Sequence, residues 1–249
     1  MMRIAAVGDL HIGLDSVGTF EHHLDQLSSQ ADALLLAGDL TRVGDPAEAA
    51  VLADALADVE LPKIGVLGNH DYHSDQQAEV TDVLEGAGVV VLEGGGVVVD
   101  VGSARLGVAG TKGFGGGFVG ASGSDFGEPE MKAFVRHTKD LASRLEESLC
   151  ALEADVRVAL LHYAPTDATL QGERLEIYPF LGSHLLGEAI DRAGADLVIH
   201  GHAHAGSEKG LTPGGIHVRN VAQPVIGQPY HLYCLGDGPD VECRTEPIL

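Results

Sequence analysis

The sequence predicts an α/β fold in which two sheets pack face to face and helices cover both outer faces. Short apolar runs alternate with amphipathic stretches, which is the pattern of βα units around largely parallel strands. The Val- and Gly-rich segment Val89–Thr111 carries turn signals and is typical of a β-meander, so it indicates a second, more antiparallel sheet. With no internal repeat and 249 residues, we predict a single domain over residues 1–249.

The individual elements follow from local composition. Aliphatic runs predict strands at Arg3–Gly8, Ala33–Ala37, Lys63–Leu67, Arg157–Leu161 and Leu197–His200. Amphipathic stretches between them predict helices at Thr19–Ser29, Pro46–Asp58, Asp75–Glu85 and Pro129–Leu152. Two more antiparallel strands are expected near the C-terminus, at Ile216–Val221 and Tyr230–Gly236.

A glycine-dense segment, Thr111–Gly127, reads TKGFGGGFVGASGSDFG and is expected to be a loop. It lacks the strand–GxGxxG–helix context of a dinucleotide-binding turn, so we do not interpret it as one. A lid beside the substrate and a plain connection both remain open for this loop.

The charge balance restricts the partners of the chain. Fifteen Lys and Arg residues against 37 Asp and Glu residues give a formal net charge of −22. Such a field repels polyanions, which argues against a nucleic-acid polymer and favours a small substrate. A homo-oligomer is compatible with the sequence.

Three features predict where the protein resides. No segment approaches the roughly 18 uninterrupted apolar residues of a membrane span, and the N-terminus MMRIAAVGDLH reads as a strand rather than a secretion signal. The scattered cysteines Cys150, Cys234 and Cys243 are interpreted as thiols of a reducing compartment. We therefore expect a cytoplasmic protein without membrane contact.

Five apolar runs each end in side chains that can bind a metal. The runs are IAAVGDLH, ALLLAGDL, IGVLGNHD, VALLHY and DLVIHGHAH, which supply Asp9 and His11, Asp39, Asn69 with His70 and Asp71, His162, and His202 with His204. In α/β sheets, ligand sites gather beyond the carboxyl ends of strands. We therefore expect these distant loops to converge on one crevice.

The residue types indicate which ions would bind. Carboxylate, amide and imidazole groups together suit Mn, Fe, Zn or Co as divalent ions. The number of candidate ligands exceeds what one tetrahedral ion uses. It suits two ions that share a bridging carboxylate at roughly 3.5–4 Å, the geometry that clamps a phosphoryl displacement.

The ordered series DLH, GDL, GNHD, H and GHAH resembles the calcineurin-like metallophosphoesterase family, and it extends from Asp9 to His204. The resemblance implies a four-layer α/β/β/α sandwich of two mixed sheets flanked by helices, the metallo-dependent phosphatase-like fold. This implied architecture agrees with the two sheets predicted above.

The resemblance also implies roles for individual residues. The first metal would be held by Asp9, His11 and His204, the second by Asn69, His162 and His202, and Asp39 would bridge them. His70 would act with Asp39 in catalysis by donating to the phosphate and protonating the leaving oxygen. Asp71 would steady the GNHD turn or His70. In contrast, His200 is expected to be a hydrogen-bonded core residue rather than a ligand.

The function implied is hydrolysis of a small phosphodiester or phosphomonoester, with a slight preference for the diester, by a hydroxide that bridges the two metals. One alternative is a phosphoprotein phosphatase, although Tyr72 and His73 follow the GNHD motif where a basic residue would favour that class. Another is a non-catalytic scaffold of the same fold that binds a protein partner. Substrate contacts are considered only by position, at Arg42, Tyr163, Thr166, Glu173 and Tyr178.

Overall fold

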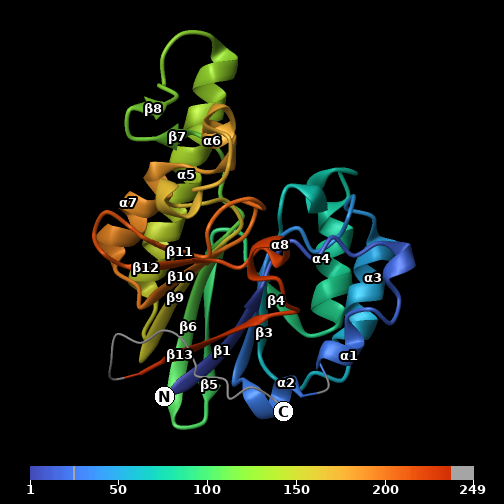
Figure 1. Ribbon diagram of the computed structural model, residues 1–249. Helices are drawn as coiled ribbons and strands as arrows, with labels where there is room; N and C mark the ends of the chain where they lie inside the picture. Colours follow the sequence, from blue (N-terminus) through green and yellow to red (C-terminus); the bar gives the residue numbers. More distant parts are fainter. Residues whose placement is uncertain (25, 237–249) are drawn as a thin grey trace.

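The computed structural model describes residues 1–24 and 26–236 and contains two large mixed sheets (Figure 1). The first sheet consists of β1 (Met2–Val7), β2 (Ala33–Ala37), β3 (Lys63–Val66), β4 (Val89–Val91) and β13 (His231–Leu235). Its strand order is β13-β1-β2-β3-β4, with β1 to β4 parallel and β13 antiparallel to β1.

The second sheet has a parallel centre and an antiparallel strand at each edge. It consists of β5 (Gly95–Val101), β6 (Ala104–Thr111), β9 (Val156–Leu161), β10 (Leu197–His200), β11 (Lys209–Leu211) and β12 (His217–Asn220), in the order β11-β12-β10-β9-β6-β5. Strands β12, β10, β9 and β6 are parallel, whereas β11 and β5 pair antiparallel with their neighbours. A small separate hairpin joins β7 (Gly117–Phe118) to β8 (Ala121–Ser122).

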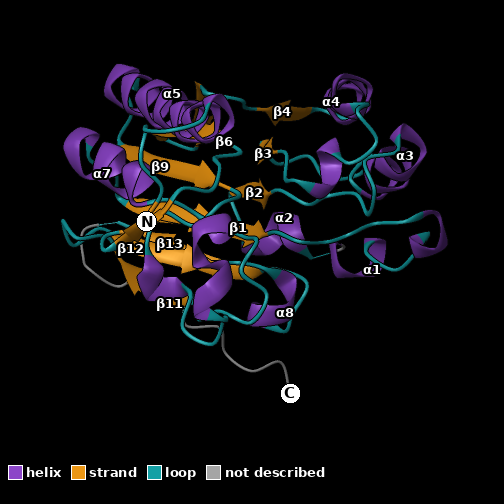
Figure 2. Ribbon diagram, turned by 90° about the horizontal axis from the view of Figure 1, so that it is seen from above, coloured by secondary structure: helices purple, strands orange, loops and turns teal. Residues whose placement is uncertain are grey.

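Helices cover the outer face of each sheet, as Figures 1 and 2 show. The first sheet is covered by α3 (Pro46–Ala55) and α4 (Gln77–Gly86), and the second by α5 (Pro129–Ala151) and α7 (His184–Ala193). Shorter helices are α1 (Glu21–Leu24), α2 (Leu27–Gln30), α6 (Tyr178–Leu181) and α8 (Gln223–Ile226). The result is the predicted sandwich of two mixed sheets flanked by helices.

The inner faces of the two sheets form the central core. Ile4, Leu35 and Ile64 of the first sheet belong to the same fully buried cluster as Leu106 and Ile199 of the second. Burial of each such side chain contributes about 1.5–3 kcal/mol. Because the period of a strand is two, the intervening residues Leu34 and Leu36 face the helices instead. This packing fixes the strands whose carboxyl ends carry the polar loops.

The helices begin where the sequence provides caps. The Asp45 carboxylate accepts a 2.8 Å hydrogen bond from the backbone N–H of Ala47, and Pro46 occupies the first turn of α3. The Ser183 hydroxyl caps α7 by accepting from the N–H of Leu185. Among the described residues, none of the helices combines the length and the apolar character needed to cross a bilayer.

Most predicted elements are present, but several assignments were wrong. The Thr19–Ser29 stretch contains α1 and α2 rather than one helix. Phe20, Leu24 and Leu27 each pack into the cluster on the outer, helix-covered face of the first sheet, and the chain bends to place all three there. Val89–Thr111 is not one meander: β4 extends the first sheet in parallel, whereas β5 and β6 form a hairpin in the second. The strand at the predicted Ile216–Val221 is parallel to β10, although it pairs antiparallel with β11.

The cysteine prediction was also wrong in part. Cys150 is a free, exposed thiol, but Cys234 is disulfide-bonded. Cys243 lies outside the described residues. The chain has no CxxC motif, and the spacing of its cysteines does not indicate a disulfide. The cysteine pattern therefore does not support a reducing compartment.

Candidate metal centre

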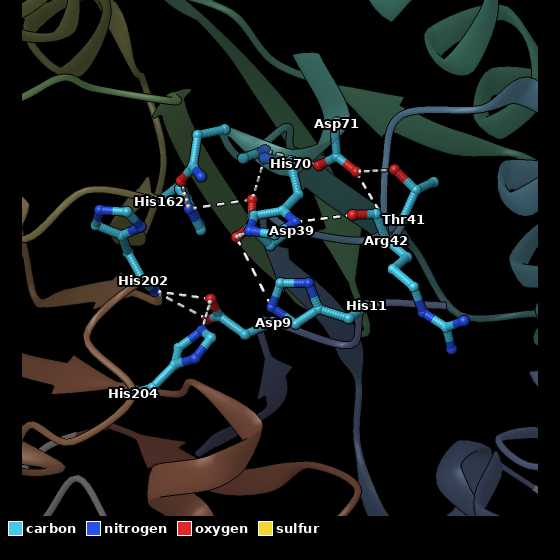
Figure 3. A network of polar contacts seen from close by, with 12 residues as sticks. Asp9, His11, Asp39, Thr41, Arg42, His70, Asp71, His162, His202 and His204 are labelled. Carbon is cyan, nitrogen blue, oxygen red and sulfur yellow. Dashed lines mark hydrogen bonds and ion pairs between the residues drawn. The ribbon is translucent and has the colours of Figure 1, made fainter. Parts of the chain in front are cut away.

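The loops that follow β1, β2, β3, β9 and β10 meet at one end of the two sheets, as Figure 3 shows. They bring the predicted ligands into two groups. One group contains Asp9, His11, Asp39 and His204, and the other contains Asp39, His162 and His202. Within each group the ligand atoms all lie within 4.8 Å of one another. Asp39 belongs to both groups, as the bridging role requires.

The first group contains an imidazole nitrogen that has no hydrogen-bond partner in the part of the chain that the structure describes. Nε2 of His204 lies 2.8 Å from Oδ1 of Asp9, whereas Nε2 of His11 lies 3.8 Å from Oδ2 of Asp39. The His11 Nε2 atom is buried and has no hydrogen-bond partner among the described residues. Leaving a buried polar atom unpaired costs about 1–3 kcal/mol, and a cation at this point would remove that cost.

The second group presents lone pairs to one another. Nδ1 of His162 lies 2.9 Å from the carbonyl oxygen of Ala37, so the hydrogen bond places the ring proton on Nδ1. The Nε2 lone pair then faces Oδ1 of Asn69 at 3.0 Å and Oδ1 of Asp39 at 3.3 Å. Three facing acceptors repel one another unless a cation lies among them. This side chain set therefore fits a metal ion.

His202 is held in two directions. Its backbone N–H donates to both oxygens of Asp9, at 2.9 and 3.1 Å, which links the two groups. Its Nε2 lies 3.2 Å from the carbonyl oxygen of Phe180. A proton on Nε2 that bonds this carbonyl leaves Nδ1 as the free ligand atom.

The protonation states favour ligand binding at most positions. Burial lowers the pKa of His11 and of His202, so both rings are held neutral. Burial opposes ionisation of Asp9, but the hydrogen bond from His204 and the charge of that ring outweigh it and lower the Asp9 pKa. The same hydrogen bond raises the pKa of His204, so a cation that binds there must displace a proton.

The backbone at the centre is strained. Asp9, His11, Asp39 and His202 have positive φ values of 57°, 45°, 49° and 71°. Non-glycine residues rarely adopt this region, and each such residue costs of the order of 1–3 kcal/mol. Strain of this kind persists where the surroundings hold side chains in a functional position.

Two glycines are needed because ligands approach their Cα atoms closely. A Cβ on Gly68 would overlap the carboxylate of Asp39, and a Cβ on Gly201 would overlap that of Asp9. Glycine therefore allows these loops to bring short side chains together at both positions.

His70 lies at the open side of the centre. Its backbone N–H donates a 2.8 Å hydrogen bond to Oδ1 of Asp39, and its Nδ1 lies 2.8 Å from the carbonyl oxygen of Arg42. Nε2 therefore points inward, 4.0 Å from Oδ2 of Asp39, while the side chain is 44% exposed. This position places Nε2 beside the two ligand groups and leaves part of the ring open to solvent.

The two remaining polar residues of these motifs are structural in the protein. Asp71 is fully buried and accepts a 2.7 Å hydrogen bond from the N–H of Gly68, so it steadies the GNHD turn as expected. Buried His200 bonds Oγ1 of Thr169 through Nε2 at 2.8 Å and the carbonyl of Gly201 through Nδ1 at 2.7 Å. His200 is therefore a hydrogen-bonded core residue, as the sequence indicated.

Most positions considered for substrate contact are occupied by internal bonds. Arg42 pairs with Asp15 at 2.8 Å, the Glu173 carboxylate accepts from the N–H of Ala205, and the Tyr178 hydroxyl donates to Leu170. Thr166 caps the 3₁₀ turn Asp167–Thr169. Tyr163 differs, because its ring centroid lies 4.3 Å from that of His202.

The sequence reasoning did not single out Lys112. This residue directly follows β6, and its backbone carbonyl accepts hydrogen bonds from the N–H groups of His162 at 3.1 Å and Tyr163 at 3.0 Å. Its place just after a strand was a usable signal, since the ligand loops share that place. Its inclusion in the glycine-dense loop Thr111–Gly127 concealed it.

Comparison with solved structures finds the same fold in distant proteins. The phosphopantetheinyl hydrolase PptH from Mycobacterium tuberculosis has a TM-score of 0.63 at 15% identity, with 88% of each chain covered. The protein TT1561 of Thermus thermophilus has a TM-score of 0.54 at 18% identity, with 89% of each chain covered. A putative 5′-nucleotidase from Staphylococcus aureus has a TM-score of 0.55 at 18% identity, covering 88% of this chain and 48% of that one.

No curated protein sequence matches the chain. In contrast, the sequence profile of the calcineurin-like phosphoesterases matches residues 2–206, which is most of the 249-residue chain and includes every predicted ligand. Metal-dependent hydrolysis of phosphoesters is the general activity of that family, and its members typically bind a dinuclear metal centre. The chain belongs to the calcineurin-like phosphoesterase family.

Proposed function

We propose that the protein hydrolyses a small phosphoester at a dinuclear metal centre. Asp9, His11 and His204 would hold one cation, and Asn69, His162 and His202 the other, with Asp39 between them. The observation that carries the proposal is the sharing of Asp39 by two groups of ligand atoms, each group within 4.8 Å. The buried Nε2 of His11, which has no hydrogen-bond partner within residues 1–24 and 26–236, supports it independently.

The donor set defines the metal chemistry. Oxygen and imidazole ligands without a thiolate suit Mn, Fe, Zn or Co. When bound, a pair of such cations supplies Lewis acidity, which activates a water molecule and neutralises phosphate oxygens. The residues of the chain hold the ligand atoms in position before binding, since Gly68 and Gly201 allow close approach and the sheets fix the loops.

His70 would handle the leaving group. The hydrogen bond from Nδ1 to the Arg42 carbonyl fixes the ring, so Nε2 is the atom that would carry the proton delivered to the departing oxygen. The backbone N–H of the same residue holds Asp39 Oδ1 in place. No serine or cysteine nucleophile is required.

The substrate is proposed to be a small phosphodiester or phosphomonoester. The net charge of −22 disfavours a nucleic-acid polymer. A structural neighbour is described as a phosphopantetheinyl hydrolase and another as a putative 5′-nucleotidase, so phosphopantetheinyl compounds and nucleotides belong in a substrate screen.

The test combines metal content with activity. Purified protein loaded with Mn²⁺ is expected to contain about two metal ions per chain and to cleave bis(p-nitrophenyl) phosphate or p-nitrophenyl phosphate. Asp39→Asn should abolish cleavage and lower the metal content. Asp75→Asn is a matched control, because Asp75 is an exposed aspartate that also has a positive φ, of 56°, but lies outside the two ligand groups.

The results that contradict the proposal are distinct. Protein that binds no divalent cation under any condition would support a non-catalytic scaffold. Metal-loaded protein that cleaves neither compound, nor any phosphoester of the screen, would exclude the proposed hydrolysis.

A further inference from the structure

The side chain of Lys112 is enclosed beside the candidate metal centre. Its Nζ lies over three aromatic rings, 4.8 Å from the centroid of Tyr72, 5.1 Å from that of Phe114 and 5.4 Å from that of Tyr163. The residue is 8% exposed. The faces of these rings stabilise a cation electrostatically.

The ammonium group has few partners in the protein. Among the described residues, its one hydrogen bond is a long contact of 3.5 Å with the carbonyl oxygen of Gly113. No carboxylate of the described residues forms an ion pair with it within 4.0 Å. An ammonium has three donors, and buried charges are ordinarily paired, so this group is poised to bind a further acceptor.

Glu93 and Asp39 interact electrostatically with Lys112 but form no ion pair with it. The Glu93 carboxylate accepts hydrogen bonds from the Tyr72 hydroxyl at 3.3 Å and the Thr111 hydroxyl at 3.1 Å. Burial lowers the pKa of Lys112, and the charges of Glu93 and Asp39 oppose that effect. The Glu93 carboxylate is thus hydrogen-bonded to Tyr72, one of the rings around the ammonium, and to Thr111.

Tyr163 connects the lysine to the metal ligands. The ring that lies under Nζ has its centroid 4.3 Å from that of His202 and 5.5 Å from that of His162. Tyr72 belongs to the 3₁₀ turn His70–Tyr72, so the opposite wall comes from the GNHD loop. The cation therefore lies between two loops that carry predicted ligands and catalytic residues.

We infer that Lys112, held by Tyr72, Phe114 and Tyr163, forms an anion subsite that binds a phosphate oxygen of the substrate. The inference rests on the proposed function, because it assigns a residue to the same site. Arg42, a second cation near the centre, forms an ion pair with Asp15 instead. Lys112 is therefore the cation that would bind a phosphate oxygen not coordinated by a metal. A phosphate oxygen would supply the acceptor that the protein does not, in a short charge-assisted hydrogen bond.

The test is calorimetric binding of inorganic phosphate to Mn²⁺-loaded protein. Lys112→Met keeps the apolar stem and removes the charge. It should retain the metals but bind phosphate about 10- to 100-fold more weakly, which is the usual effect of losing a hydrogen bond to a charged group. Lys139→Met is the matched control, because Lys139 is exposed and pairs with Asp125. The phosphate affinity of this control variant should equal that of the wild type.

A double variant separates phosphate binding from a mere counter-charge. If Lys112 only balanced Glu93, then Lys112→Met with Glu93→Gln would recover wild-type phosphate affinity, and that recovery would overturn the inference. We expect the double variant to remain weak. Equal affinity of Lys112→Met and wild type, with metals retained, would also overturn it.

A measurement on the wild-type protein tests the same inference without a substitution, so it does not depend on whether a variant folds. Phosphate should slow acetylation of Lys112 in the Mn²⁺-loaded protein, followed by peptide mass mapping, while acetylation of Lys139 stays constant. Unchanged labelling of Lys112 in protein that binds phosphate would refute the subsite alone. Wild-type protein that binds neither Mn²⁺ nor phosphate would instead refute the proposed function.

Discussion

The hydroxyl of Thr41 donates a 2.6 Å hydrogen bond to the buried carboxylate of Asp71, and the backbone N–H of Thr41 donates to the same oxygen at 2.7 Å. The other oxygen accepts from the N–H groups of Gly68 at 2.7 Å and Leu40 at 3.2 Å. These bonds join the loop after β2 to the loop after β3 (Figure 3). Since the first loop carries Asp39 and the second carries His70, Asp71 sets the distance between them.

Replacement of Asp71 should therefore affect both stability and metal binding. Asp71→Ala leaves buried N–H donors unpaired and should lower the free energy of unfolding by about 3 kcal/mol or more. Thr41→Val removes a hydroxyl that donates to Asp71 and accepts a 3.0 Å hydrogen bond from the N–H of Gly44, and it should cost about 2 kcal/mol. Urea unfolding measures the first effect, and Mn²⁺ calorimetry should show weakened binding for Asp71→Ala. Equal losses for the two variants would contradict this account.

Replacement of His70 should act on the leaving group. His70→Gln removes the proton that Nε2 would deliver, so kcat should fall by about 10²–10⁴-fold for alkyl phosphoesters. The fall should be smaller for p-nitrophenyl esters, whose leaving oxygen needs no proton. Steady-state kinetics over a series of leaving groups tests this. His73→Gln, at an exposed neighbouring residue, should leave kcat unchanged, and a uniform fall across the series would argue against an acid role.

Replacement of Gly201 should selectively damage one half of the centre. The methyl group of Gly201→Ala would overlap the Asp9 carboxylate, which the proposal assigns to one metal only. We expect the metal content to fall from about two ions per chain to about one. Gly86→Ala is the control, because a Cβ at Gly86 meets no atom within 4 Å. Elemental analysis decides, and retention of both ions would exclude a separate role for Asp9.

The ion pair at the start of the first sheet gives a pH-dependent prediction. The Asp32 carboxylate accepts 2.8 Å hydrogen bonds from the backbone N–H and from Nη2 of Arg3. Burial opposes ionisation of Asp32, but these bonds outweigh it and hold its pKa below the ordinary value. The unfolded chain therefore binds the proton more readily. The stabilisation is complete above the unfolded pKa, about 4, and is lost as the pH falls through the folded pKa.

Asp32→Asn should accordingly cost about 1 kcal/mol at neutral pH, a value reduced because the pair is partly exposed and screened by solvent. Urea midpoints at pH 7 and pH 5 should show the same difference between variant and wild type. At pH 3.5 the difference should shrink. Asp58→Asn, at an exposed position, should be neutral throughout, and a constant difference down to pH 3.5 would disprove the assigned pKa shift.

The sequence by itself determined the positions and chemistry of the predicted ligands. Each follows a short run of aliphatic residues bounded by turn residues, which favours a buried strand, so the polar residues at the ends of the runs were predicted with the strands. The long helix α5 was likewise predicted from its amphipathic repeat, which local spacing encodes.

Only the tertiary structure decided which strands are neighbours. The parallel pairing of β4 with β3, the parallel pairing of β12 with β10, and the division of Thr19–Ser29 into two helices depend on packing between distant segments. Lys112 belongs to the same class. Its neighbours Tyr72 and Tyr163 lie far from it in sequence, and β6 meets β9 only in the folded sheet. Hydrophobic patterns specify which face of an element is buried but not which partner covers it, and so non-local contacts are fixed only by the fold.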